Sequence, residues 1–447
     1  MNQIIAAVNY VLSFKSYVML PILMLILCII VRMKLAKAVK ACMTLGIGFI
    51  GIFIVFDYFV GKIGPVISSI VQRTGSQMNV LDVGWPPLAA ITWSFKLAPL
   101  LIIIILLVNI VMLVFKWTET VNIDIWNFWH FIFTAQLVFT VSGSLLLSIC
   151  SAIFASILCI KLADWSADRL QEFSGLEGVV TTTLSGLAYY PTTLFINKII
   201  DKIPGLSTLE ADPKTIQKKL GFFGESMFIG FIMGIGLGVV AGFSLKDVLE
   251  LGFSIAAVVF ILPKMCGILG EGIMPISDSM KAYMLKRFPN MKNSYIGLDL
   301  AIIVGQPAVV VSGILLMPVA LILAFILPGI KFIPIGDLPN MIGAVAVIVV
   351  ATRGNIIRAC IAAIPVIIAK LYIASAMAPI YTSLAKSVDF KVNGYDGIIT
   401  SFLDGGNAMR FWIMKLFTGN IWAIIIIPVV VYLLYITRLD SLKKKSV

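Results

Sequence analysis

Residues 81–93 read LDVGWPPLAAITW, a stretch in which an acidic residue and helix-breaking residues interrupt a largely apolar chain. Gly84 and the two prolines that follow Trp85 stop a regular helix and leave backbone N–H and C=O groups without intrahelical partners. In a membrane, such a break is tolerated only where it lines a water-filled or protein-enclosed cavity. A carboxylate at membrane depth is costly unless it faces water, a partner or a ligand, so Asp82 is a candidate functional residue.

The composition of the chain places it in a membrane. Of its 447 residues, 60% are hydrophobic and 13% are charged, and the mean hydropathy is +1.05, far above that of a soluble domain. Because a transmembrane helix needs about 20 mostly apolar residues, we predict an all-α polytopic membrane protein with about 11 transmembrane helices, at 17–32, 43–60, 97–115, 125–141, 144–162, 226–243, 249–265, 304–328, 339–352, 355–376 and 419–437. Several runs are short or interrupted by Pro or Gly, which indicates broken or re-entrant segments.

The distribution of charge predicts the orientation and excludes nucleic acid as a partner. The net charge of +12 comes from basic residues that gather at the ends of apolar runs and in a few loops, as membrane topology requires. Lys and Arg are enriched in cytoplasmic loops, and their clusters follow the first, seventh and last runs. With 11 spans these clusters share one side, so we expect the N-terminus outside and the C-terminus in the cytoplasm.

Several residue types predict that the chain itself carries no chemistry. The six cysteines lie mostly inside apolar runs, without a CxxC pair, which favours small buried hydrophobes over a metal or redox site. The sequence contains no P-loop, kinase set, HExxH or GxSxG motif. We therefore predict no catalytic residue, no metal and no cofactor, and expect the energy for transport to come from an ion gradient or from partner proteins.

Landmarks recur in the same order at separations of 210 to 221 positions. The paired residues are Pro65 with Pro275, Asp124 with Asp337, Gly143 with Gly354, Gly84 with Gly305 and, more loosely, Asp82 with Asp299. An ordered series at a nearly constant offset indicates an internal repeat. Each half holds five predicted spans, an odd number, so the second half would enter the membrane inverted. Inverted repeats are typical of transporters that bind substrate near the membrane midplane.

These features divide the chain into five parts. They are a first transmembrane repeat at 1–162, a cytoplasmic linker at 163–225, an inverted second repeat at 226–376, a loop or re-entrant segment at 377–418, and a final helix with a basic tail at 419–447. The linker contains TTTLSGLAYYPTTLFINKII at 181–200, a weakly apolar piece that is expected to be amphipathic or re-entrant.

Polar and aromatic residues beside the breaks are candidate substrate ligands. The second half contains LDLAIIVGQPAVV at the position equivalent to LDVGWPP, and this motif adds Asp299 and Gln306 to the candidates. Carboxylates and amides exchange paired hydrogen bonds with neighbouring hydroxyls, and the face of Trp85 can cover the apolar side of a sugar or polyol. These residues predict a site for a polyhydroxylated substrate. The alternative places Asp82 in an exposed loop and Trp85 in the interfacial aromatic belt.

Two further segments carry candidate residues. His130, the only histidine, follows NIDIWNFW, where a structural or interfacial role is the alternative to substrate binding. The Asn and Asp residues before it have the side chains of helix caps. Residues 401–412, SFLDGGNAMRFW, place Asp404 and Asn407 on either side of a glycine pair. This segment is either an unwound binding segment or an ordinary loop.

The motifs taken together resemble one transporter family. LDVGWP, VNIDIWNFWH, IPGLSTLEADPKTIQKKLG followed by FGE, IGLDLAIIVGQPAVV, PIGDLP, RGNIIR and LDGGN resemble the galactitol-type integral membrane component IIC of the bacterial phosphoenolpyruvate-dependent sugar phosphotransferase system. The resemblance extends over nearly the whole chain. Two positions depart from the family pattern, because TTTLSGLAYY lacks a His and Gln306 stands where the family has one, which leaves the exact substrate open.

The resemblance implies transport coupled to phosphorylation in the bacterial plasma membrane. A galactitol-like polyol would enter from outside and receive phosphate from a phosphocysteine on component IIB, itself charged by component IIA. Similarity to the ascorbate-type component implies a homodimer whose substrate-holding core, with Asp82, Trp85, Asp299 and Gln306, slides against a dimerising scaffold. The positive loops and residues 163–225 would then dock component IIB. The alternatives are an ion-coupled secondary transporter on the same repeats and, less favoured, a passive channel.

Overall fold

The computed structural model describes residues 16–74, 78–206, 221–287, 295–387 and 397–444, together with 211–213, 215 and 218. Helices dominate these residues, and the strands among them are only three or four residues long. Each of the predicted apolar runs coincides with a helix or with consecutive helices. The hydropathy pattern therefore located the helices. It does not show that they pack into two layers, which the structure does.

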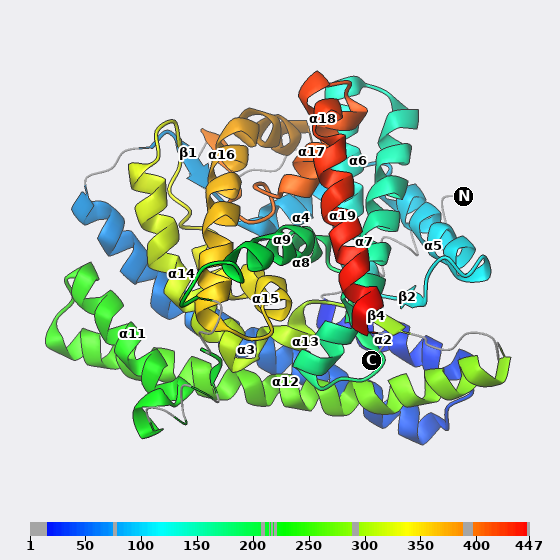
Figure 1. The fold of residues 1–447 in the computed structure, drawn as a ribbon, viewed down its shortest axis with the longest axis horizontal. Helices are drawn as coiled ribbons and strands as arrows, with labels where there is room; N and C mark the ends of the chain where they lie inside the picture. Colours follow the sequence, from blue (N-terminus) through cyan, green and yellow to red (C-terminus); the bar gives the residue numbers. More distant parts are fainter. Residues whose placement is uncertain are drawn as a thin grey trace.

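Four of the described helices form one layer, which we call the slab. They are α2 (Ser16–Ile30), α3 (Leu35–Thr74), α11 (Ser226–Ala241), which follows the short η2 (Gly221–Gly224), and α12 (Leu245–Arg287). In Figure 1, α12 runs along the lower part of the view and packs against α3. At a rise of 1.5 Å per residue, α3 and α12 are about 60 Å and 65 Å long, twice the roughly 30 Å hydrocarbon core. Both helices must lie obliquely in the membrane or extend beyond it.

The remaining elements form a second layer, the core bundle. Its longer helices are α5 (Ala98–Val114), α6 (Trp129–Ser142), α7 (Leu145–Ser174), α14 (Pro307–Ile326), α15 (Met341–Ala351), α16 (Ile356–Ser387) and α19 (Ile427–Lys444). Its shorter elements are α4 (Trp85–Trp93), η1 (Ile125–Phe128), α8 (Leu184–Leu187), α9 (Tyr190–Ile200), α13 (Ala301–Val304), η3 (Leu338–Asn340), α17 (Ala408–Phe417) and α18 (Ile421–Ile425). The helices α7, α14, α16 and α19 stand steeply across the direction of α12 in Figure 1.

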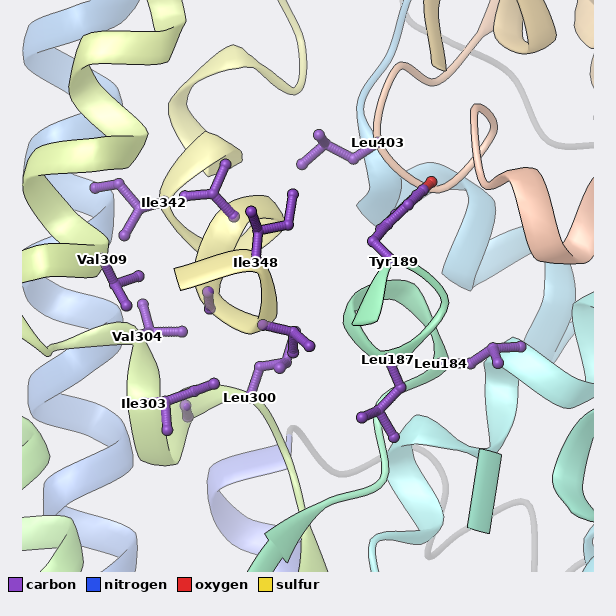
Figure 2. Close-up of a cluster of buried hydrophobic side chains, with 14 of the residues drawn as sticks. Leu184, Leu187, Tyr189, Leu300, Ile303, Val304, Val309, Ile342, Ile348 and Leu403 are labelled. Atoms are coloured by element: carbon purple, nitrogen blue, oxygen red, sulfur yellow. The ribbon is translucent and has the colours of Figure 1, made fainter. Parts of the chain in front are cut away.

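Close packing of apolar side chains holds the short elements inside the core bundle. Figure 2 shows the buried side chains of Leu300, Ile303 and Val304, on and next to α13, in a cluster with Ile342 and Ile348 of α15. Contacts between helices in a membrane depend on such close packing, because lipid chains are as apolar as the side chains themselves. The cluster fixes the broken helices α8 and α13 beside the cavity described below.

Two small parallel sheets connect segments that are distant in the sequence. In one sheet β1 (Val80–Asp82) pairs with β5 (Ile398–Thr400), with Val80 opposite Ile398. In the other, β4 (Tyr295–Leu298) lies between β2 (Thr120–Asn122) and β3 (Val179–Thr181). Non-helical backbone inside a membrane protein needs internal hydrogen-bond partners. Strand pairing supplies them where the helices are interrupted.

The structure identifies fewer complete membrane spans than the hydropathy pattern predicts. Among the described residues, five helices are long and apolar enough to cross a membrane: Leu35–Ile70, Leu145–Ser174, Leu245–Ile276, Pro307–Ile326 and Ile356–Ser387. The pair α4 and α5, bent by 91°, raises this to six if it forms one broken span. The chain is thus a multi-pass helical membrane protein, and the count of 11 spans stays a prediction.

The two segments set apart in the sequence as linker and loop continue the core bundle. α7 extends past residue 162 to Ser174, and α16 extends past residue 376 to Ser387. After α7 the chain enters β3, α8 and α9, and after α16 it enters β5 and α17. Both helices therefore continue past the ends of the apolar runs 144–162 and 355–376.

Candidate functional site

A cavity of about 490 Å³ lies where the core bundle meets the slab. The slab contributes Phe49, Ile52 and Asp57 of α3 to its wall. The core bundle contributes the polar lining, mostly from the interrupted segments: the carboxylates of Asp124, Asp299 and Asp404, the amides of Asn127 and Asn340, the hydroxyls of Thr183 and Ser185, and the side chains of Lys370 and His130. This volume and mixed lining are typical of a small-molecule site.

The stretch LDVGWPP turns the chain from β1 into α4 at the edge of this cavity. Gly84 has a φ of 75° and precedes the first residue of α4, with proline in the first helical turn. A Cβ at Gly84 would lie 2.9 Å from the carbonyl oxygen of Gly336, so the site admits only glycine. The helix breakers of the sequence therefore start a short helix at Trp85, whose side chain lines the cavity.

Asp82 is buried and binds backbone rather than facing the cavity. Its Oδ1 accepts hydrogen bonds from the backbone N–H of Gly84 at 3.2 Å and of Phe402 at 3.0 Å. Its Oδ2 accepts one from the backbone N–H of Asp337 at 3.1 Å. The carboxylate thus joins three chain segments that are far apart in the sequence.

Asp337 makes the reciprocal set of bonds. Its Oδ1 accepts a hydrogen bond from the backbone N–H of Trp85 at 2.8 Å. Its Oδ2 accepts bonds from the hydroxyl of Ser401 at 2.7 Å and from the backbone N–H of Leu403 at 2.9 Å. Asp337 is fully buried as well. The two acids together position the start of α4 and the turn that follows β5.

That turn, residues 401–406, is bound on its carbonyl side by buried donors. Lys370 Nζ donates to Leu403 O at 2.7 Å, Tyr381 Oη to Gly405 O at 2.6 Å, Tyr189 Oη to Gly406 O at 3.4 Å, and Arg410 Nη1 to Asp404 O. Figure 2 shows the ring of Tyr189 directed towards the turn that carries Leu403. Because side chains satisfy all four carbonyls, the turn remains irregular and still ordered, and it presents Leu403 and Asp404 to the cavity.

A buried ion pair lies at the end of this turn. Arg410 Nη2 is 3.3 Å from Asp404 Oδ1 and 2.9 Å from His130 Nδ1, and His130 Nδ1 is 3.4 Å from the same carboxylate oxygen. The guanidinium carbon of Arg410 lies 4.8 Å from the ring centroid of Phe133. Charge-assisted bonds of this kind are strong in a water-poor interior. They fix both the carboxylate and the imidazole at the cavity wall.

A second group of acids lies on another part of the wall. The side-chain amide of Asn127 donates to Asp124 Oδ2 at 2.6 Å and to Asp299 Oδ2 at 2.5 Å. Asp124 also accepts from the backbone N–H of Asn127 and so caps η1. These two carboxylates share one bridging donor, which leaves acceptor positions directed to the cavity.

Three tryptophans supply the aromatic part of the wall. Trp85 and Trp129 are stacked with ring centroids 6.2 Å apart, and Trp126 contacts Trp93 at 6.0 Å. Trp85, Trp126 and Trp129 all line the cavity. The wall therefore combines flat apolar faces with acids and amides, which suits a ligand with C–H faces and many hydroxyls.

The structure separates the seven predicted site residues into two groups. Trp85, His130, Asp299 and Asp404 line the cavity. Asp82, Gln306 and Asn407 are not among the lining residues: Asp82 lies in the network above, and Gln306 and Asn407 are the residues preceding α14 and α17. Asn407 caps α17 by accepting from the backbone N–H of Arg410 at 2.9 Å.

Sequence reasoning missed several residues of the site. Lys370 lies inside the apolar run 355–376, where a charged residue is itself a functional signal that could have been used. Asp124 and Asn127 have cap-type side chains; Asp124 does cap η1, Asn127 lies within it, and both also line the cavity. Arg410 belongs to the quoted motif SFLDGGNAMRFW, yet only the fold brings it to His130.

The described residues include no group of three or more His, Cys, Asp or Glu side chains that could hold a metal ion. The cavity has two groups of polar side chains and an aromatic wall. It lies between two layers of helices in a multi-pass membrane protein. These are the features of a carrier for a small hydrophilic molecule.

Comparison with known proteins identifies the family of this carrier. Residues 10–396 match the family model described as "PTS system sugar-specific permease component". Over 418 residues the chain is 34% identical to the "Putative permease IIC component" of Escherichia coli (strain K12), covering 94% of this chain and 95% of that protein. Over 420 residues it is 33% identical to the "PTS system galactitol-specific EIIC component" of the same strain, covering 94% and 92%.

The chain belongs to the sugar-specific permease components of the phosphotransferase system. The resemblance drawn from the sequence motifs is thereby confirmed. Membership implies a sugar or polyol as substrate and cytoplasmic phosphotransferase components as partners.

Proposed function

We propose that this permease component takes up a galactitol-like polyol and that component IIB phosphorylates the polyol on the cytoplasmic side. The observation that carries the proposal is the cavity wall, which places acids and amides around tryptophan faces. Carboxylates accept pairs of hydrogen bonds from neighbouring hydroxyls, and indole rings cover C–H faces. The likeness to a galactitol-specific component supports the choice of polyol.

The substrate contacts in this proposal come from both polar groups of the cavity. Asp299, with Asp124 and Asn127, would receive hydroxyls at one end, and Asp404 and His130 would receive them at the other, with Trp85 between. Asp82, Gln306 and Asn407 would act from behind the wall. All of the proposed contact residues line the cavity, which supports this division.

The proposal includes two inverted repeats with 11 spans, the N-terminus outside and the C-terminus inside. The order of elements supports it: α2, α3, β1, α6 and α7 are followed, in the same order, by α11, α12, β4, α15 and α16. Strand pairing supports it too, since β1 pairs with β5 and β4 pairs with β3. A reporter fused after Lys444 should respond as a cytoplasmic one, and an external response would contradict the 11-span topology.

The two layers support an elevator-type movement of the core bundle against the slab. In this proposal the slab is the scaffold that dimerises, and the core bundle carries the polar wall across the membrane. The cavity lies between the layers, where such a movement would change its access. Crosslinking of cysteine pairs between α3 and the core bundle should arrest uptake, while pairs within the core bundle should not.

Uptake into vesicles tests the proposal directly. With component IIB and an excess of phosphorylated component IIA supplied inside, labelled galactitol should accumulate only as its phosphate ester, because the phosphoryl group passes from component IIA to the Cys of component IIB and then to a galactitol hydroxyl, which loses its proton. Replacement of the reactive Cys of component IIB should stop formation of the ester, while galactitol still binds the permease. Accumulation of free galactitol without partners, abolished by a protonophore, would instead establish ion-coupled secondary transport.

A further inference from the structure

Two acids outside the cavity control the position of two parts of its wall. Asp82 and Asp337 are 5% and 0% exposed, and neither lines the cavity. Their six hydrogen bonds go to three segments: the residues that begin α4, the residues before η3, and the turn 401–406. Trp85 and Asp404 stand on the first and third of these segments, and both line the cavity.

The carboxylate is specifically required at both positions. Five of the six donors are backbone N–H groups and the sixth is the hydroxyl of Ser401. An asparagine side chain offers one acceptor oxygen, and its amide would face an N–H donor. Buried donors left without an acceptor cost the full desolvation penalty. The network therefore cannot adopt the same geometry with an amide.

Lys370 completes the network from the other side of the turn. The residue is 3% exposed, and its ammonium donates to Leu403 O at 2.7 Å and lies 4.5 Å from the ring centroid of Tyr189. The N–H of Leu403 donates to Asp337 at 2.9 Å. The peptide groups on both sides of Leu403 are thus held by opposite charges, one from Asp337 before η3 and one from Lys370 of α16.

We propose that Asp82, Asp337 and Lys370 are positioning residues of the substrate site, which hold Trp85 and the turn 401–406 in their binding geometry. This inference rests on the proposed function, because it assumes that the cavity binds the polyol. Asp82 then acts on substrate binding through Trp85 and the turn, without contacting the substrate itself. The three residues set the distance between the aromatic wall and Asp404.

The test combines binding with local backbone order in the full-length protein in nanodiscs. Galactitol affinity and hydrogen–deuterium exchange of the peptide spanning 397–407 are measured without partners for D337N, K370M and D82N. We expect D337N and K370M to weaken binding at least about tenfold and to speed exchange in that peptide, since each removes a buried charge-assisted bond. D82N, like D337N, keeps the oxygen that accepts two of the three hydrogen bonds and loses the third, so its effects should be similar in size.

The kinetics provide a second readout. With components IIB and IIA present, D337N should raise the KM for galactitol more than it lowers the maximal rate, because the turn forms part of the binding site and the phosphoryl donor is on a partner. D440N is the matched control. Asp440 forms an ion pair with Arg169 at 2.5 Å on α19, away from the cavity, so its loss should leave galactitol affinity and the exchange of 397–407 unchanged.

The outcomes separate this inference from the proposed function. Weakened galactitol binding without faster exchange in 397–407 would show that the three residues do not act through the order of the turn, and would overturn the inference. Faster exchange with unchanged binding would overturn it as well. If the wild-type protein binds no galactitol, the proposed substrate fails, whereas unchanged exchange in D337N and K370M would independently remove the positioning network.

Discussion

Two turns reach the cavity from equivalent positions in the chain order, and they are stabilised by different chemistry. The turn 401–406 follows β5, and residues 182–187 follow β3; each of these strands pairs in parallel with a strand from the other half of the chain. The turn 401–406 is held by charged side chains, namely Asp82, Asp337, Lys370 and Arg410. The residues 182–187, which we call the neutral turn, are held by uncharged groups: the amide of Asn122, the thiol of Cys159 and their own threonine hydroxyls.

Three hydrogen bonds fix the neutral turn to other segments of the core bundle. Thr182 Oγ1 donates to Asn122 Oδ1 at 3.0 Å, and Cys159 Sγ donates to Thr182 O at 3.1 Å. Thr183 Oγ1 accepts from the backbone N–H of Leu300 at 3.2 Å. Both turns line the cavity, through Thr183 and Ser185 in one and Leu403 and Asp404 in the other.

The two turns should differ in how strongly a single substitution destabilises the protein. A neutral hydrogen bond contributes about 0.5–1.5 kcal/mol, and one to a charged group about 1.5–3 kcal/mol. The loss of one partner from a buried ion pair leaves an uncompensated charge and costs more. The charged turn should therefore respond strongly to single substitutions, and the neutral turn weakly.

The largest effect is expected for Arg410→Met. It removes the partner of the buried Asp404 carboxylate, so the free energy of unfolding should fall by about 3–5 kcal/mol. Thermal unfolding of the purified protein in detergent measures the loss. The double variant R410M/D404N should be less destabilised than the sum of the single ones, because the pair is coupled. Additive losses would show that the ion pair does not hold the turn.

A smaller difference is expected between alanine substitutions at matched glycines. A Cβ at Gly406 would lie 2.6 Å from the carbonyl oxygen of Lys370, whereas one at Gly186 would meet the side-chain atoms of Val347 at 2.8 Å and Leu300 at 3.0 Å. Side chains yield more readily than backbone, and overpacking costs about 1–3 kcal/mol. Gly406→Ala should fall at or above the upper end of this range and Gly186→Ala at the lower. Equal melting temperatures would contradict the rigidity assigned to the charged turn.

The sequence predicted the helices better than their grouping. Apolar runs of helical length located the helices, because hydropathy is a local property. The predicted runs 43–60 and 249–265 are shorter than α3 and α12, because the ends of these two helices carry polar residues that lower the local hydropathy. The slab and the paired strands depend on contacts between residues more than 100 positions apart, such as Val80 with Ile398 and Val179 with Ile296, which hydropathy does not encode.

For the site, the sequence predicted the kinds of residue but not their roles. The breaks at LDVGWPP and LDGGN were correctly found as irregular segments, because Gly and Pro act locally. Asp82 and Asp299 looked alike in sequence, yet Asp82 meets Phe402, 320 positions away, and Asp299 meets Asn127. Which carboxylate faces backbone and which faces the cavity is decided by those long-range contacts.

A moderate effect on affinity is expected for Asp299→Asn. Asp299 precedes Leu300, whose backbone N–H is held by the neutral turn, and its carboxylate lines the cavity. The loss of a hydrogen-bonded carboxylate should cost about 1–3 kcal/mol, or about 5- to 150-fold in affinity. Equilibrium binding of labelled galactitol measures it. Wild-type affinity would remove Asp299 from the proposed contacts and leave Asp404 as the main polar anchor.

The smallest effect is expected for Thr182→Val, which tests the neutral turn without changing the cavity wall. The substitution keeps the side-chain shape but removes the bond to Asn122 Oδ1, so the free energy of unfolding should fall by about 1–2 kcal/mol with galactitol affinity unchanged. Thr193→Val is the matched control. Its hydroxyl donates to the carbonyl of Tyr189 within its own helix at 2.7 Å, a bond that adds little to helix stability. If Thr182→Val were as damaging as Arg410→Met, the two turns would be equally sensitive, and charge would not explain how they differ.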